Sequence, residues 1–371
     1  MRGPAPSGSA RCAGVATTCE PTRYYSCSVP SCMVPTLRLN DGRDIPALAL
    51  GTWLGNNTKG RVKPGSDEVE RAVTWALEAG YTHVDTAFAY RIEDQVGRAL
   101  AKKISDGAKR EDLFITTKLW NDAHAREAVV PALRRSLANL QLEYVDLYLI
   151  HWPVGQFVSI PGLKSAHSIA HNINRSYQHL TSQNNQTYDY TDYLETWRGM
   201  MDAKSLGLAR SIGVSNFNAQ QIDRLLANGL EKPAVLQVEI NLNLQQPELL
   251  AYSREQDIRV MGYTPFGSLF PGKAEPDAPP PRVDDPELVA IANNHNKTVP
   301  QVALRYLVEL GVIPLPKSLS RSRIVENVAV FDFELSAAER GALRACDRRH
   351  RTIPQRKHAC GEPQVSPSHT L

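Results

Sequence analysis

The sequence predicts an α/β protein whose main body is a (β/α)8 TIM barrel, with an N-terminal β-hairpin and long connecting loops. Eight short apolar runs recur along the chain, and nearly all of them are followed by a segment of helical periodicity. Chemically active side chains stand where successive runs end, at Asp85, Lys118 and His151. Because a parallel barrel brings the carboxyl ends of its strands to one face, we expect these side chains to meet there.

The first predicted element is a β-hairpin of residues 36–39 and 43–46, because Asp41-Gly42 supplies the positive-φ turn that a tight hairpin needs. It could plug the bottom of the barrel. Strands are expected at 47–52, 81–84, 113–117, 145–150, 210–214, 234–239, 259–263 and 311–314. Helices are expected from a cap at Ser66 to Gly80, and at 92–104, 125–140, 192–206, 218–228, 247–255, 299–310, 321–328 and 336–345.

The chain divides into one large domain, residues 35–350, and two ends. Residues 1–34 are expected to be a disordered extension or a gene-model error, since the first 32 are rich in Ser, Pro, Gly and Cys and contain no apolar signal segment. Met33 is an equally acceptable start, and a mitochondrial transit segment stays open as an alternative. Residues 351–371 are expected to be an irregular C-terminal tail.

The amino-acid composition limits the classes of function that are possible. The 371 residues are 42% hydrophobic and 22% charged, and 42 basic against 39 acidic residues give a net charge of +3. Without a basic block or a long apolar run, we expect no nucleic-acid partner and no membrane span. The cysteines all precede the first strand or follow the last, which favours a reducing, cytoplasmic location over a disulfide framework. No metal-binding spacing occurs, so no metal site is expected.

The rival architecture is a doubly wound sheet. Such a sheet would need a glycine-rich G-x-G-x-x-G turn after its first strand to hold a dinucleotide. The sequence contains neither that motif nor a P-loop. The two long connections, 154–190 and 269–286, also suit the binding loops of a barrel.

Four residues predict a proton-donating site. A free tyrosine has a pKa of about 10, and a neighbouring ammonium group lowers it by favouring the phenolate. Lys118 can act in this way on Tyr90, while Asp85 holds Lys118 charged and His151 orients a carbonyl oxygen. The set contains no nucleophile, so it indicates a group that protonates an oxygen as negative charge develops on it.

Such a site needs a hydride source, and a nicotinamide cofactor fits this need. Tyr263, at the end of the seventh strand, can stack on a flat ring, and Ser215, Asn216 and Gln237 can hold an amide. Taken singly, Ser215 and Asn216 are turn or cap residues and Tyr263 is a core residue. Their shared position at strand ends favours the binding site.

Together these segments resemble the aldo-keto reductases, from about residue 35 to residue 345. The motifs that carry the resemblance are Gly51-Thr52-Trp53, residues 83–90, Thr117-Lys118-Leu119-Trp120, Ile150-His151-Trp152-Pro153, Gly213-Val214-Ser215-Asn216-Phe217, Gln237-Val238-Glu239, and Ile313-Pro314 followed by Pro316-Lys317-Ser318.

The resemblance implies NADPH-dependent reduction of aldehydes and ketones by a monomer, with Tyr90 as general acid beside Asp85, Lys118 and His151. It implies that the nicotinamide is held by Ser215, Asn216, Gln237 and Tyr263. It further implies that the 2′-phosphate is gripped by Lys317, Ser318, Ser320 and Arg323, and the adenine by Glu326 and Asn327. Trp53 and Trp120 are the candidate substrate-pocket residues.

Several segments look most like insect members, notably the lepidopteran 3-dehydroecdysone reductases, which makes a keto steroid a candidate substrate. His151 favours carbonyl reduction, since relatives that reduce steroid double bonds carry Glu there. Three features depart from the family pattern: Leu236 where many members have Asn before the glutamine, a segment 154–190 longer than that of the insect relatives, and a tail without the usual Tyr-Pro-Phe ending. The last two are walls of the substrate pocket in the family. The alternative function is a non-catalytic NADPH-binding structural or regulatory barrel.

Overall fold

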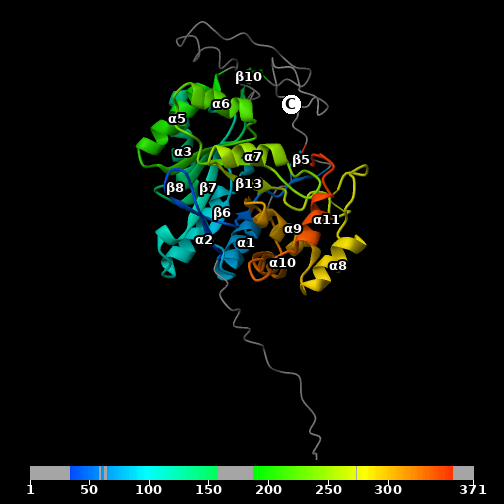
Figure 1. Cartoon of the computed structure of the whole chain (residues 1–371). Helices are drawn as coiled ribbons and strands as arrows, with labels where there is room; N and C mark the ends of the chain where they lie inside the picture. The colour runs from blue at the N-terminus through cyan, green and yellow to red at the C-terminus, as the bar shows by residue number, and fades with distance from the viewer. Residues whose placement is uncertain are drawn as a thin grey trace, which may run out of the picture. The chain divides into compact units, whose positions relative to one another are not determined.

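The computed structural model describes residues 34–57, 60–61, 65–157, 187–189, 191–272 and 274–353. Within them, eight parallel strands form one sheet, in the spatial order β14-β13-β12-β11-β8-β7-β6-β3, with helices on its outside (Figure 1). The strands are β3 Leu50–Gly51, β6 His83–Asp85, β7 Phe114–Leu119, β8 Val145–Ile150, β11 Ala209–Ser215, β12 Val235–Glu239, β13 Arg259–Tyr263 and β14 Val312–Pro314.

Backbone hydrogen bonds join the first strand of the sheet to the last. The Ala49 amide donates to the Pro314 carbonyl at 3.2 Å, and the Gly51 amide donates to the Pro316 carbonyl at 3.0 Å. These bonds leave neither edge open, so the predicted (β/α)8 barrel is confirmed.

The helices between the strands agree with the predicted ones to within two or three residues, except at two places. The described helices are α1 Glu68–Glu78, α2 Glu93–Ser105, α3 Arg126–Leu140, α5 Tyr193–Ser205, α6 Ala219–Ala227, α7 Pro247–Glu255, α8 Pro286–Asn294, α9 Val299–Glu309, α10 Arg321–Val328 and α11 Ala337–Arg344, with short 3-10 turns η1 Phe88–Tyr90 and η2 Arg110–Asp112.

The first exception is the start of α1, where the predicted cap at Ser66 was wrong. Asp67 occupies the N-cap position without a side-chain cap, and the Ser66 carbonyl accepts a hydrogen bond from Arg98 instead. The second exception is α8, which was not predicted because the Pro-rich segment before it reads as loop. Its start is nevertheless encoded locally, since the Asp285 side chain accepts from the Glu287 and Leu288 amides.

The N-terminal hairpin pairs β1 Thr36–Arg38 with β2 Asp44–Pro46, and Gly42 has the expected positive φ of 83°. Asn40 donates to the carbonyls of Pro233 and Asp257, at 2.9 and 3.0 Å. Since these two residues precede β12 and β13, the hairpin lies at the amino-terminal end of the barrel, as predicted.

Two apolar layers surround the sheet. The smaller one combines inward-facing barrel residues such as Leu147, Val235 and Met261 with Ile45 of the hairpin, and all four are completely buried or nearly so. The larger one lies between the strands and the outer helices and contains Trp197, whose indole also donates to the Glu231 carbonyl. Because both layers are filled, the barrel is a packed core whose chemistry is confined to its ends.

Two short antiparallel pairs were not predicted: β4 Asn56–Asn57 with β5 Gly60–Arg61, and β9 Gly155–Phe157 with β10 Thr187–Asp189. The second pair joins the two ends of the long connection after β8. The rest of that connection, and the predicted N-terminal extension and most of the C-terminal tail, lie outside the described residues. No described helix has the length and apolarity to cross a membrane.

Close approach of α2 to α3 yields a stability prediction. A Cβ atom on Gly97 would lie 2.5 Å from the Asn139 carbonyl oxygen and 2.9 Å from the Leu140 Cα. Gly97→Ala must therefore push two helices apart, and we expect it to lower the free energy of unfolding by about 1–3 kcal/mol. The control is Gly341→Ala in α11, where a Cβ meets open space, which should raise stability by about 0.4–1 kcal/mol. Urea unfolding midpoints measure both, and equal midpoints for the two variants would contradict this packing.

Candidate active site

Three neighbouring strands and one short turn bring the four predicted catalytic residues together. Asp85 is the last residue of β6, Lys118 is near the end of β7, and His151 follows β8. Tyr90 ends the 3-10 turn η1 that follows β6. The positions lie next to one another because β6 pairs with β7 and β7 pairs with β8, all in parallel.

Lys118 is the centre of this group. Its side chain is fully buried, and its ammonium donates to Asp85 Oδ1 at 2.7 Å, to the Thr86 carbonyl at 2.9 Å and to the Tyr90 hydroxyl at 3.4 Å. Burial lowers the pKa of Lys118, and the Asp85 carboxylate opposes that change. The three donors of the ammonium group are thus all directed, one of them at the phenol.

Aromatic rings adjoin the Tyr90 phenol. The ring of Trp53 lies 6.5 Å from that of Tyr90 at an interplanar angle of 29°. His151 meets Tyr90 edge to face at 5.8 Å, and Trp120 meets His151 in the same manner at 5.1 Å. The two candidate pocket residues therefore adjoin the catalytic group, Trp53 at the Tyr90 ring and Trp120 at the His151 ring.

The amide-bearing residues adjoin the same group from β11, β12 and β13. Tyr263 donates its hydroxyl to Asn216 Oδ1 at 2.8 Å, and Asn216 Nδ2 donates to the His151 carbonyl at 2.9 Å and to Ser215 Oγ at 3.2 Å. Asn216 holds a left-handed backbone with φ 64°, which Asn tolerates better than most residues. The cluster therefore touches the segment that carries His151.

Gln237 makes a contact that the sequence did not predict. Its Nε2 donates to Asp85 Oδ2 at 2.8 Å, while Asp85 Oδ1 accepts from Lys118. One buried carboxylate thus connects the ammonium group to the amide cluster. These residues are 152 positions apart, so only closure of the barrel brings them together.

A second group of predicted residues lies beyond β14 and on α10. Ser318 Oγ accepts from the Ser320 amide at 3.0 Å, which forms the turn that starts the helix. Arg323 is exposed, and no hydrogen bond or ion pair engages it among the described residues. Its neighbour Glu326 accepts instead from Thr298 Oγ1 at 2.6 Å, so the i,i+3 pair that would make Arg323 an ordinary surface residue does not form. Lys317 is partly buried and Asn327 is buried.

These residues fit a nicotinamide dinucleotide phosphate. Hydroxyl and amide groups of Ser215, Asn216 and Gln237 match a carboxamide, and the Tyr263 ring offers a face for a flat ring. The Arg323 guanidinium suits a phosphate bidentately. Among the described residues no group of three or more His, Cys, Asp or Glu side chains could hold a metal ion.

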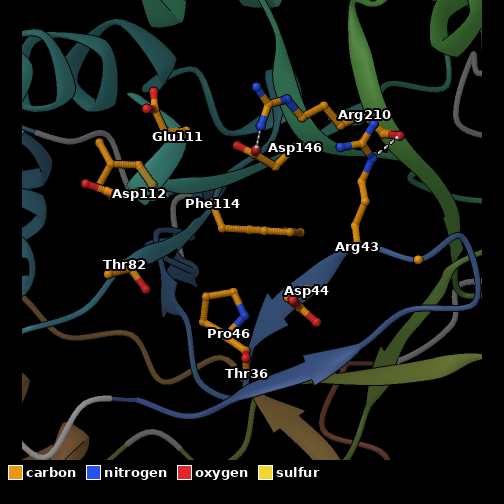
Figure 2. Close-up of a pocket in the computed structure, with 12 residues that line it drawn as sticks. Thr36, Arg43, Asp44, Pro46, Thr82, Glu111, Asp112, Phe114, Asp146 and Arg210 are labelled. Atoms are coloured by element: carbon orange, nitrogen blue, oxygen red, sulfur yellow. Dashed lines mark hydrogen bonds and ion pairs between the residues drawn. The ribbon is translucent and has the colours of Figure 1, made fainter. Parts of the chain in front are cut away.

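A hollow of about 380 Å³ lies at the other end of the barrel and contains none of the predicted site residues (Figure 2). The hairpin and the ends of neighbouring strands line it. Arg43 Nε donates to the Arg210 carbonyl at 3.1 Å, and Arg210 lies 3.8 Å from Asp146 Oδ1. The Asp146–Arg210 pair joins the neighbouring strands β8 and β11, which indicates a structural role at this end.

Comparison with known proteins gives the family of the chain. The model of the Aldo/keto reductase family matches residues 47–348. Aldo-keto reductase AKR2E4 of Bombyx mori is 46% identical over 320 residues, covering 86% of this chain and 94% of that protein. Its crystal structure in complex with NADP has a TM-score of 0.75, at 45% identity over 87% of this chain and 96% of that chain. The structure of silkworm AKR2E5 complexed with NADPH has a TM-score of 0.76, at 39% identity over 86% and 90%. The predicted likeness to insect members is confirmed.

The buried ion pair predicts a pH-dependent stability. Because burial lowers the pKa of Lys118, the unfolded chain binds more protons between that lowered pKa and the ordinary value of 10.5, so stability rises with pH across this window. Asp85→Asn removes the group that opposes the lowering and should cost about 3–5 kcal/mol at pH 7. In this variant the pKa of Lys118 falls further, so the pH range over which stability rises becomes wider. The loss of unfolding free energy relative to the wild type should therefore shrink as pH rises toward 10.

Urea midpoints at pH 7 to 10 test this expectation. Asp202→Asn is the matched control, because Asp202 pairs with Arg126 at 2.7 Å on the exposed surface, where such pairs contribute little. A deficit for Asp85→Asn that stays constant across the pH range would contradict the assignment of Lys118 as its cause.

Proposed function

Because the chain belongs to the aldo/keto reductase family, we propose that it reduces aldehydes and ketones to alcohols with NADPH, and that Tyr90 is the general acid. The observation that carries the proposal is the continuous path from the buried Asp85 through the buried Lys118 to the half-buried Tyr90 hydroxyl. An ammonium group beside a phenol favours the phenolate and so makes the phenol a better proton donor near neutral pH.

Asp85, Tyr90, Lys118 and His151 would act as one unit. The substrate carbonyl oxygen would lie within reach of the Tyr90 hydroxyl and the His151 ring, and Tyr90 would deliver a proton to that oxygen as negative charge develops on it. Lys118 would stabilise the phenolate left behind, and Asp85 would keep Lys118 charged in its buried position. NADPH, when bound, supplies the hydride.

Two groups would hold NADPH. Ser215, Asn216, Gln237 and Tyr263 would fix the nicotinamide, because their amide and hydroxyl groups lie beside the catalytic group. Lys317, Ser318, Ser320 and Arg323 would bind the 2′-phosphate, with Glu326 and Asn327 at the adenine. The solved relatives with NADP and NADPH support this assignment.

The walls made by Trp53 and Trp120 favour a carbonyl compound with an apolar, flat body, since indole faces offer large apolar contact areas. A keto steroid such as 3-dehydroecdysone is a substrate of this kind, and aromatic aldehydes are another. We also infer that the protein acts as a cytoplasmic monomer.

The second candidate function is a non-catalytic NADPH-binding barrel with a structural or regulatory role. It would keep the residues of the cofactor group and have no need of an intact proton path. NADPH oxidation with a panel of aldehydes and 3-keto steroids, followed at 340 nm, separates the two functions.

Tyr90→Phe tests the proposed acid. Phe keeps the ring between Trp53 and His151 but has no proton to donate, so we expect kcat to fall by about 10²–10⁴-fold. The dissociation constant for NADPH should change little, because the cofactor contacts come from other strands. Stopped-flow turnover and fluorescence titration measure the two quantities. Full turnover in this variant, with normal NADPH binding, would refute the mechanism and revive the binding-protein alternative.

Arg323→Ala tests the phosphate site. Removal of an arginine from a charge-assisted contact should weaken NADPH by about 1.5–3 kcal/mol while leaving NADH nearly unaffected. Arg321→Ala is the matched control, since Arg321 lies on the same helix but pairs with Glu78 at 3.1 Å. Titration of all three proteins with both nucleotides gives the comparison. If Arg323→Ala weakened the affinities for NADPH and NADH equally, Arg323 would not bind the 2′-phosphate and would be an ordinary surface residue.

A further inference from the structure

The segment after Gln237 is buried on both of its sides. It runs from the end of β12 toward α7 and alternates polar with apolar residues. Such alternation ordinarily indicates one solvent-exposed face and one buried face. Here every member exposes less than a tenth of its surface. The polar members are Glu239, Asn241, Asn243 and Gln245, and the apolar ones are Ile240, Leu242 and Leu244. Buried polar groups need partners, so the polar side must face something specific.

Two sets of partners satisfy this polar side. The side chains of Asn241 and Asn243 bond Thr264, Ser268, Pro279 and Pro280. Gln245, Glu239 and the Asn243 backbone bond the end of α11 and the C-terminal segment after it. Gln245 Nε2 donates to the Leu343 carbonyl at the end of that helix, at 2.8 Å. The Asn243 carbonyl then accepts from the amides of Arg348 and His350, each at 3.0 Å. Successive backbone groups of the tail are therefore bound, one after another, to this segment.

Glu239 makes the last of these contacts. Its Oε1 accepts from the Thr352 amide at 2.7 Å and its Oε2 from the Ile353 amide at 3.1 Å. Asn241 Nδ2 lies 3.2 Å from Oε1, and the Arg351 guanidinium lies 3.8 Å from Oε2. Burial raises the pKa of Glu239, while the two amides and Arg351 oppose this change. Each of these partners is a donor, which suits a carboxylate that accepts on both oxygens.

These contacts lie at the rim of the candidate active site. Glu239 pairs in register with Tyr263 across β12 and β13. Burial raises the pKa of Tyr263, and the charge of Arg351 opposes this change. In the order of strands around the barrel, β12 is three places from both β3 and β7, the strands that precede Trp53 and Trp120. The tail thus lies across the mouth from these two residues.

We propose that Glu239 is a positioning residue, whose carboxylate seats residues 351–353 as a wall of the substrate pocket opposite Trp53 and Trp120. This rests on the proposed function. A small aldehyde at Tyr90 does not span the mouth, whereas a bulky ketone does. Glu239 therefore affects the selection of substrates by size and leaves the proton path unchanged.

The test is Glu239→Gln in the full chain, with 4-nitrobenzaldehyde and a 3-keto steroid as substrates. An amide turned toward the Thr352 and Ile353 amides leaves at least one buried donor without an acceptor. We expect their hydrogen-exchange protection to fall by about tenfold or more, as for loss of a bond to a charged group. KM for the steroid should rise by about the same factor, while kcat and KM for the aldehyde stay within about twofold.

Two further variants make the result specific. Glu248→Gln removes an exposed carboxylate that also contacts the tail, through Arg349 at 3.0 Å, and should change neither property. Glu239→Asp keeps the charge and should restore part of the protection and the steroid KM. If Glu239→Gln does not fold, Arg351→Ala must give the same change in selectivity.

The outcomes separate this proposal from the proposed function. Lost exchange protection in Glu239→Gln with an unchanged ratio of steroid KM to aldehyde KM would overturn the positioning role. The role would also be overturned if Glu239→Gln and Glu248→Gln changed the steroid KM equally. A wild-type protein that turns over neither substrate would refute the proposed function instead, and the exchange data alone would then show whether Glu239 holds the tail.

Discussion

A fully buried ammonium group is the constraint on which the candidate site depends. Lys118 has no access to water, and a lone charge in that position would cost several kcal/mol, so the structure must supply a carboxylate and further acceptors around it. Asp85 from the neighbouring strand supplies the charge, and the Thr86 carbonyl and the Tyr90 hydroxyl complete the shell. The acceptors that make a charged lysine tolerable in the core thus also direct its ammonium group at the Tyr90 phenol.

The barrel makes this arrangement possible because its stabilising core and its polar site lie at different levels along its axis. Toward the amino-terminal end, apolar side chains and the hairpin fill the interior, and at the bottom the charged groups around Asp146 are occupied with one another. At the carboxyl ends of the strands, the inward side chains become polar and converge. Stability is supplied mainly by the first region, so the second can carry groups that are costly to bury.

Buried carboxylates connect the parts of this polar end. Asp85 joins Lys118 to Gln237, and Glu239, two residues further along β12, joins the barrel to the C-terminal segment. In both cases the carboxylate accepts from donors that lie on segments distant in the sequence. A carboxylate can accept several hydrogen bonds at once, which makes it suitable for linking separate segments at a strand end.

The sequence alone determined the strands, the barrel and the identity of the residues at strand ends, because hydrophobic periodicity and the position of a side chain at the end of a run are local properties. It missed α8 and misplaced the start of α1, where a Pro-rich stretch and a serine gave misleading local signals. Only the tertiary structure decided that Gln237 bonds Asp85, that Asn216 bonds the His151 segment, and that Glu239 binds the tail. These contacts join residues 65 to 152 positions apart, and they follow from strand register and barrel closure, which no local pattern encodes.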